Sequence, residues 1–486
     1  MTFEIVFVLL SLLGMVAALI ADKMRPGMIL FSVVVLFLCA GILTPKEMLE
    51  GFSNKGMITV ALLFLVSEGI RQSGTLGQVI KKLLPQGKTT VFKAQLRILP
   101  SVAFISAFLN NTPVVVIFAP IIKHWAKSVN LPATKFLIPL SYVTILGGIC
   151  TLIGTSTNLV VHGMILEAGF EGFSMFELGK VGIFIAIAGI IYIFLFSKRL
   201  LPDARPDTAV PDEEIEEGEK FHRVEAVLGA RFPGINKKLK DFNFQRHYGA
   251  EVKEIKTRNG QRFVSNLEEV VLHEGDTLVV MADDTFIPTW GESSVFVLLT
   301  NGNEPDTTGK KKRWFALLLL VLMIVGATVG ELPITKEMFP DIKLDMFFFV
   351  SITTIIMAWT NLFPARKYTK YISWDILITI ACAFAISKAM VNSGVADSVA
   401  KFIIGLSDDY GPHVLLAMVF IITNLFTELI TNNAAAALAF PLALSISAQL
   451  GVSPTPFFVV ICMAASASFS TPIGYQTNLI VQGIGN

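Results

Sequence analysis

Polar side chains interrupt two long apolar stretches of the chain. The first stretch is Phe108–Pro120 (FLNNTPVVVIFAP), where two asparagines and a threonine precede a proline. The second is Ile430–Pro441 (ITNNAAAALAFP). Because proline removes a backbone donor and the amides need partners, such a segment at membrane depth must be buried in protein or line a cavity. We therefore interpret the two stretches as halves of one binding site.

Two further breaks, Gly154–Asn158 (GTSTN) and Gly474–Asn478 (GYQTN), lie in later apolar segments. A broken helix exposes backbone carbonyls, which together with asparagine oxygens suit a hard cation such as Na⁺. The N-termini of half-helices carry free N–H groups and the positive end of the helix dipole, which suit an anion. No lysine or arginine lies inside the four segments. This chemistry predicts cation-coupled uptake of an anion rather than pairing of the anion with a buried arginine.

Two acidic residues, Glu68 and Glu428, also fall at membrane depth, where ionisable side chains are functional candidates. We expect Glu428, which follows Thr427, to support the second stretch or to carry a proton; direct contact with substrate is the weaker alternative for both. His162 lies close to the first break, where we expect a structural role. The six histidines form no metal or catalytic-triad spacing, so the sequence does not indicate an enzyme.

Three anchors recur in the same order in the two halves of the chain. The spacing from the serine of the serine–glycine pair to the tip asparagine is 38 residues in the first half and 39 in the second. The spacing from the tip asparagine to the asparagine of the later break is 47 residues in the first half and 46 in the second. On segments that enter from opposite sides, this order predicts an inverted-topology repeat with its site near the midplane. The anchors are Ser73–Gly74, Asn111 and Asn158 in the first half, and Ser393–Gly394, Asn432 and Asn478 in the second.

Composition supports a membrane protein. The chain has 486 residues, of which 53% are hydrophobic and 16% charged; soluble domains are typically about 25% charged. The mean hydropathy is +0.65. The formal net charge of +1 does not indicate nucleic acid as a partner.

The chain divides into three parts. Residues 1–201 form the first membrane repeat, with a re-entrant hairpin at 98–122 and a broken helix at 136–166. Residues 310–486 form the second, with a hairpin at 414–441 and a broken helix at 457–484. Basic residues on both flanks of 98–122 favour a hairpin that enters and leaves on one side; a single kinked span is the alternative. The second repeat lacks a counterpart of the span at Val181–Phe196, so we expect one more helix in the natural protein.

Residues 202–309 are predicted to be a linker and a small cytoplasmic α/β domain at about 221–285. Strands are expected at Phe221–Leu228, Glu251–Arg258 and Thr277–Met281, and a short helix at Phe232–Phe242, whereas 293–308 resembles a linker. A disordered loop is the alternative. Basic residues before and after this part assign it to the cytoplasmic side.

At the tips and breaks the sequence resembles the divalent-anion/sodium symporter family, which transports sulfate or di- and tricarboxylates. The tripeptides Asn110–Thr112 and Thr431–Asn433 resemble the family's Ser-Asn-Thr tips, and the breaks resemble its Gly-Thr-Pro-Pro-Asn motif. The resemblance implies a multi-pass cell-membrane homodimer that works by an elevator-type motion. It also implies two Na⁺ sites and no organic cofactor.

Carried onto this sequence, the resemblance assigns the site residues. The first Na⁺ site would use Ser106, Asn110, Asn111 and Gly154, and the second Thr427, Asn432 and Gly474. Asn158 and Asn478 would support the breaks. The substrate would lie between the tips, near Asn111, Thr112, Thr155, Asn432, Asn433 and Tyr475.

Departures from the family pattern bear on the substrate. Asn110, Thr431 and Asn433 replace Ser, Ser and Thr, so the site is rich in amides. We expect sulfate or a similar inorganic oxyanion, with di- or tricarboxylates as the alternative. The 221–281 segment resembles the TrkA-C domain, for which a packing module and a nucleotide- or small-ligand regulator both remain open. Two other functions are the alternatives to transport. One is an anion sensor that signals through this domain, and the other is an ion channel that this domain regulates.

Overall fold

The computed structural model defines a helical body and a small β-sheet. It describes residues 3–21, 23–203, 221–229, 232–257, 261–283, 286, 290, 295–300, 310–405, 411–471 and 474–485. The acidic linker that follows residue 203 and the segment 301–309 lie outside the described residues.

The helices before the sheet follow the apolar pattern of the sequence closely. Several begin at capping residues: Thr44 and Glu47 form a reciprocal capping box, and the Asn54 side chain accepts a hydrogen bond from the Gly56 N–H. The helices are α1 (Phe3–Ile20), α2 (Pro26–Cys39), α3 (Pro45–Glu50), α4 (Lys55–Gln72), α5 (Thr75–Leu83), α6 (Val91–Ser106), α7 (Asn111–Ser128), α8 (Thr134–Gly148), α9 (Ser156–Glu167) and α10 (Gly179–Leu200).

The helices after the sheet repeat much of this order. They are α13 (Lys310–Gly330), α14 (Pro333–Met338), α15 (Met346–Trp359), α16 (Tyr368–Tyr371), α17 (Trp374–Asn392), α18 (Val395–Gly405), α19 (Pro412–Leu429), α20 (Asn432–Leu450), α21 (Thr455–Ser466) and α22 (Gln476–Gly485). A short helix, α5 or α18, comes before each helix pair that carries a tip.

Seven segments in the described part of the chain are long and apolar enough to cross a membrane. Only 17% of the α1 segment is buried in protein, against 72% of α20. Such exposed apolar surface on α1 is expected where a helix faces lipid, whereas α20 lies in the core. The molecule is therefore a mostly helical, multi-pass membrane protein.

The predicted interruptions are present as breaks between helices. The first pair, α6 and α7, is separated by residues 107–110, and the second pair, α19 and α20, by residues 430–431. The later apolar segments break at 149–155, between α8 and α9, and at 467–475, between α21 and α22. The helices of both pairs extend beyond the predicted hairpin limits, because the polar flanks continue the helices.

Corresponding helices make corresponding contacts in the two halves. Helix α6 packs on α8, and α19 packs on α21. The halves also interlock, since α2 packs on α17, α15 on α4, α20 on α9, and α22 on α7. The ends of α7, α9, α20 and α22 that start at breaks are thereby brought to the middle of the body.

The inserted part is mainly an antiparallel sheet, with strands in the order β3-β2-β4-β1-β5. The strands are β1 (Phe221–Leu228), β2 (Glu251–Lys256), β3 (Arg262–Phe263), β4 (Thr277–Asp283) and β5 (Phe296–Thr300). Strand β5 lies where we expected only linker. Buried aromatic residues, including Phe232, Phe244 and Tyr248, fill the core on one face of the sheet.

The predicted helix at Phe232–Phe242 is wrong. That segment forms turns and a short 3-10 helix, and the α-helix, α11 (Phe244–Tyr248), starts later. Pro233 and Gly234 disfavour a helix here. The Asn243 side chain instead caps α11 by accepting a hydrogen bond from the Arg246 N–H at 3.0 Å.

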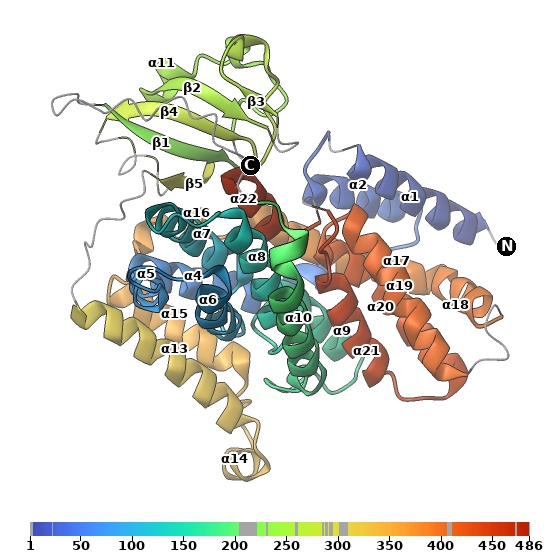
Figure 1. Ribbon diagram of the computed structural model, residues 1–486. Coiled ribbons are helices and arrows are strands. Elements are labelled where there is room, and N and C mark those ends of the chain that lie inside the picture. Colours follow the sequence, from blue (N-terminus) through green and yellow to red (C-terminus); the bar gives the residue numbers. More distant parts are fainter. Residues whose placement is uncertain are drawn as a thin grey trace.

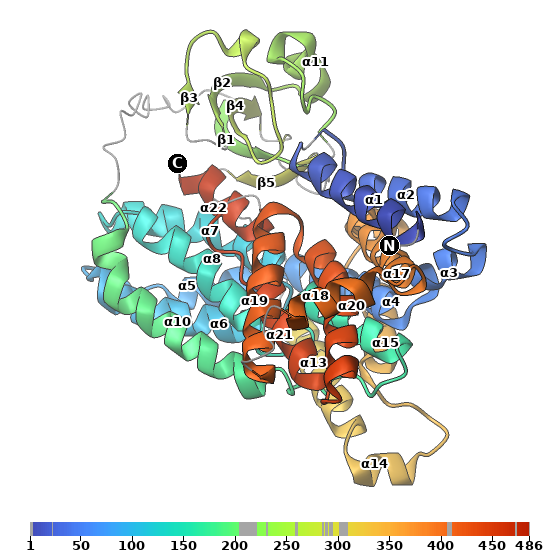
Figure 2. The same ribbon diagram turned by 90° about the vertical axis from the view of Figure 1, so that its right-hand side faces the viewer.

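The sheet sits on one end of the helical body, at the end opposite α14 (Figures 1 and 2). Strand β1 contacts α22, and β5 contacts α7. The Thr277 hydroxyl of β4 donates to the Gly483 carbonyl of α22 at 2.9 Å. Lys123 of α7 forms an ion pair with Glu225 of β1 at 3.0 Å. The sheet is therefore attached directly to two of the helices that start at breaks.

Candidate functional site

The first tip places an asparagine among oxygen atoms. Asn111 is 1% exposed, and its amide lies 2.7 Å from Ser106 Oγ, 3.2 Å from the Gly154 carbonyl and 3.1 Å from the Thr144 carbonyl. The other end of the amide contacts the Tyr475 hydroxyl at 2.5 Å. Without a cation, the amide nitrogen is best turned toward the three oxygens, because it can donate to them.

The same cluster fits a cation when the amide is turned the other way. Asn111 Oδ1 would then join Ser106 Oγ and two carbonyls, a set of hard oxygen ligands of the kind that Na⁺ prefers. The amide nitrogen would donate to Tyr475, whose hydroxyl can accept as well as donate. The Tyr475 hydroxyl can therefore pair with either end of the Asn111 amide.

The second tip repeats this geometry. Thr427 lies five residues before Asn432, as Ser106 does before Asn111, and its hydroxyl donates to Asn432 Oδ1 at 2.9 Å. The same hydroxyl lies 2.6 Å from the Ala465 carbonyl on α21. Thr427 is fully buried. Oxygen atoms from a hydroxyl, an amide and a broken-helix carbonyl thus meet at the second tip as well.

Both breaks are held by an asparagine in the same way. The Asn158 amide donates to the carbonyl of Gly148 at 3.4 Å and to that of Thr151 at 2.9 Å. The Asn478 amide donates to the carbonyls ten and seven residues before it, at 2.8 and 3.2 Å. These bonds satisfy carbonyls that the interrupted helix leaves unpaired. The supporting role of both asparagines stays a prediction.

Close backbone approach requires glycine beside each tip. A Cβ atom at Gly148 would lie 2.5 Å from Asn111 Oδ1, and one at Gly154 would lie 2.4 Å from the Gly148 carbonyl. At Gly474, a Cβ atom would lie 2.8 Å from the Thr427 carbonyl and 2.0 Å from Ser468 Oγ. Gly474 thus lies against Thr427, and Gly154 lies against Gly148, the glycine beside the Asn111 amide.

Side chains also connect the two halves across the centre. The Tyr475 hydroxyl lies 3.1 Å from Thr155 Oγ1, and Asn433 Oδ1 accepts from Thr157 Oγ1 at 3.2 Å. Thr112 Oγ1 donates to Gln476 Oε1 at 3.1 Å. The N-terminal ends of α7, α9, α20 and α22 therefore meet at one place. Helix ends of this kind supply free N–H groups and the positive end of the helix dipole.

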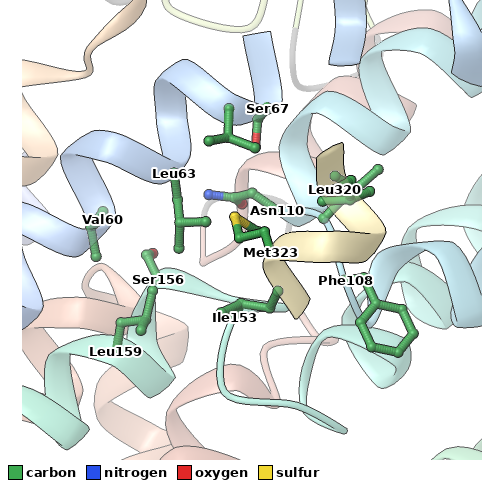
Figure 3. A pocket seen from close by; sticks show the side chains of 12 residues that line it. Val60, Leu63, Ser67, Phe108, Asn110, Ile153, Ser156, Leu159, Leu320 and Met323 are labelled. Atoms are coloured by element: carbon green, nitrogen blue, oxygen red, sulfur yellow. The ribbon is translucent and has the colours of Figure 1, made fainter. Parts of the chain in front are cut away.

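A small pocket beside the first tip contains Asn110 rather than Asn111. Figure 3 shows the Asn110 side chain extending toward Ser67 and Leu63 of α4, with Met323 of α13 on another side. Ser156, at the start of α9, also lines the pocket. Its free volume is about 10 Å³, close to the space of one water molecule.

The predicted site residues thus fall into separate groups. Ser106, Asn111 and Gly154 are together, as are Thr427, Asn432 and Gly474, while Asn110 faces the neighbouring pocket. Its role as a Na⁺ ligand stays a prediction. The carbonyls of Thr144 and Ala465 and the Ser67 hydroxyl are additions that the sequence did not suggest; a backbone carbonyl carries no side-chain signal.

The two acidic candidates have different surroundings. Glu68 is paired with Arg71 at 2.6 Å and accepts from Gln72 on its own helix. The Glu428 carboxylate accepts hydrogen bonds from the break between α21 and α22. The His162 ring packs closely on Gly172.

Fold and site together define a polytopic membrane protein whose polar centre is built from helix breaks, the class to which many transporters belong. The citrate transporter (CitMHS) family matches residues 16–446 and 342–486. The chain belongs to this transporter family, and the resemblance drawn from its tips and breaks is confirmed.

Several relatives are similar over most of the chain. An uncharacterized transporter of Synechocystis sp. is 29% identical, covering 93% of this chain and 88% of that protein. A putative sulfur deprivation response regulator of Chlamydomonas reinhardtii is 26% identical, covering 94% and 92%. Sodium/sulfate cotransporter 1 of the same alga is 33% identical, over 58% of this chain and 32% of that protein.

Proposed function

We propose that the protein is a Na⁺-coupled symporter of a divalent anion, with sulfate or a similar inorganic oxyanion as substrate. The observation that carries the proposal is the Asn111 cluster, in which an amide, a hydroxyl and two carbonyls converge at a helix break. This oxygen set suits a small hard cation. The relative named sodium/sulfate cotransporter 1 supports sulfate as the substrate.

Coupling follows from the charge of the centre. Four helix N-termini attract an anion but carry only partial charges. Two Na⁺ ions, one at Asn111 with Ser106 and Gly154 and one at Asn432 with Thr427 and Gly474, would supply the remaining positive charge. The anion, placed near Thr112, Thr155, Asn433 and Tyr475, would then bind well only when Na⁺ is present.

The mechanism is an elevator-type motion of an inverted repeat within a cell-membrane homodimer, with the sheet on the cytoplasmic side. The inverted repeat predicted from the anchors, with a tip in each half, supports this mechanism. The TrkA-C-like sheet would act as a packing module or as the site of a small-ligand regulator.

A carboxylate transporter is the second candidate, favoured by a separate observation. A sodium-dependent dicarboxylate transporter of Staphylococcus saprophyticus is 28% identical over 24% of this chain. The abundance of amides at the tips argues for sulfate instead, since Asn110 and Asn433 stand where the resembled family has Ser and Thr.

Uptake into proteoliposomes tests the proposal. The full chain is reconstituted, and accumulation of labelled sulfate, succinate and citrate is followed with an inward Na⁺ gradient or with K⁺ or choline in its place. We expect Na⁺-dependent sulfate accumulation. Succinate or citrate uptake alone would favour the second candidate. Tight anion binding without accumulation would favour a sensor, and no Na⁺ dependence with any anion would contradict both transport proposals.

A further inference from the structure

One carboxylate at membrane depth is surrounded by hydrogen-bond donors. Glu428 Oε1 accepts from the backbone N–H groups of Phe469 and Ser470, each at 3.0 Å. Oε2 accepts from the Thr471 N–H at 3.0 Å, from the Thr471 hydroxyl at 2.9 Å and from Ser468 Oγ at 3.3 Å. Five donors from one break thus converge on the two oxygens of this carboxylate.

These bonds lead directly to the second tip. The Thr471 hydroxyl, which donates to Glu428, accepts a hydrogen bond from the Gly474 N–H at 3.2 Å. Gly474 in turn lies against the Thr427 carbonyl, so closely that a Cβ atom would be 2.8 Å away. The position of Gly474 beside Thr427 and Asn432 therefore depends on Glu428, acting through Thr471.

The first break lacks this support. Thr151 lies seven residues before Asn158, as Thr471 lies before Asn478, and its hydroxyl donates to the Ala107 carbonyl. Ala107 follows Ser106 as Glu428 follows Thr427, but it has no carboxylate. The first break instead uses a backbone bond from the Leu152 N–H to a carbonyl of the next loop, at 3.0 Å. At the position after the tip hydroxyl, the second half thus has a carboxylate and the first half has an alanine.

We propose that Glu428 is the positioning residue of the second Na⁺ site, and that it makes this site electrostatically stronger than the first. The proposal rests on the proposed function, in that it deepens the Na⁺ dependence assigned there. The carboxylate does not touch the ion, because its oxygens are occupied by donors from the break. It orders the loop that carries Gly474 and contributes a fixed negative charge in a medium of low dielectric constant, where charge acts over longer distances than in water.

Three variants and a matched control test the proposal. Glu428→Gln removes the charge, and its amide hydrogens face the donors of the break. Thr471→Val breaks the link to Gly474 but keeps the charge, and Thr471→Ser restores the hydroxyl. Thr151→Val makes the same change in the first break, where no carboxylate is present.

The half-saturating Na⁺ concentration for uptake is the main readout. We expect Glu428→Gln and Thr471→Val each to raise it about tenfold, the effect of losing one charge-assisted hydrogen bond. The half-saturating sulfate concentration at saturating Na⁺ should change much less, Thr471→Ser should resemble the wild type, and Thr151→Val should shift Na⁺ dependence less than Thr471→Val. A purely structural role would instead lower the maximal rate and leave Na⁺ dependence unchanged.

A second measurement separates this inference from the proposed function. Thermal unfolding of the purified full chain is followed as Na⁺ replaces K⁺, which reports Na⁺ binding without transport. If no anion is taken up, but Na⁺ stabilises the wild type at lower concentrations than Glu428→Gln, the proposed function fails and the inference stands. Equal Na⁺ dependence of the wild type and Glu428→Gln overturns the inference. If Glu428→Gln does not fold, unchanged Na⁺ dependence of Thr471→Val overturns it.

Discussion

Asn433 and Thr112 occupy corresponding positions at the two tips, yet they have different partners. Asn433 Oδ1 accepts from hydroxyls of Ser156 and Thr157 at the start of α9, whereas Thr112 donates to Gln476 at the start of α22. Each side chain therefore connects its own tip to the opposite break. The two contacts correspond in the repeat, but the side-chain types differ where we propose that the anion binds.

Replacing Asn433 tests this asymmetry. Asn433→Thr removes the acceptor for Thr157 and makes the second tip resemble the first. One neutral hydrogen bond contributes about 1 kcal/mol, so we expect a change of about fivefold in the half-saturating concentrations of competing anions. Na⁺ dependence should change less.

The reciprocal variant Thr112→Asn is the matched control, because it increases amide content at the other tip. Competition of sulfate, succinate and citrate for uptake measures both variants. An unchanged anion profile in Asn433→Thr would place this side chain outside the anion site.

At the scale of elements, the two breaks depend on buried amide donors. Asn158 is completely buried and Asn478 nearly so, and each donates to two carbonyls of its own break. Since no water in the hydrocarbon region replaces such bonds, these asparagines fix the shape of α8–α9 and α21–α22.

Substituting each asparagine separates donor chemistry from volume. Asn158→Ala and Asn478→Ala should each destabilise the protein by about 1–3 kcal/mol, because carbonyls are left unpaired. Asn158→Asp and Asn478→Asp keep the size of the side chain but remove the amide N–H donors. We expect proteins with these changes to be no more stable than the alanine variants. Thermal unfolding of the purified protein measures the stabilities of the wild type and the four variants. An aspartate variant as stable as the wild type would rule out the donor role.

The parts of the fold that polar residues specify in an apolar context were predictable from sequence. The breaks at Gly154 and Gly474 and both tips appear where amides and glycines interrupt hydrophobic runs. Strand β3 was not predictable, because two residues carry no periodicity. Strand β5 was assigned to linker although its sequence, FVLLT, is apolar and typical of a strand. The Asn110 orientation and the Thr144 carbonyl depend on packing between distant helices, which no local pattern encodes.

At the scale of the whole molecule, ionic contacts connect the sheet to the helical body. Glu225 lies between Lys123 of α7 and Lys256 of β2, at 3.0 and 3.5 Å. Burial lowers the pKa of Lys256, although the attraction of Glu225 opposes this effect. The ion pair between Lys123 and Glu225 is partly exposed, so its energy depends on salt.

A double-mutant cycle measures that connection. Lys123→Gln and Glu225→Gln should show a coupling of about 0.5–1 kcal/mol in thermal stability at low salt, and less at high salt. If the sheet influences transport, both single variants should change the maximal uptake rate by similar factors. The uptake rate of the double variant should then be close to that of either single variant. Lys253→Gln, on an exposed part of the sheet, is the control. Additive effects of the two changes would show that the ion pair does not connect the parts.

The attachment of the sheet also links the buried tips to a part of the molecule that lies at the end of the helical body. Lys123 lies twelve residues from Asn111 on one continuous helix, about 18 Å along its axis. Gly483 is similarly joined to Tyr475 through α22. Tilting or sliding of these helices near the tips would displace the sheet, where a fluorescent label is accessible. A label on the sheet would therefore report movement of the buried tips.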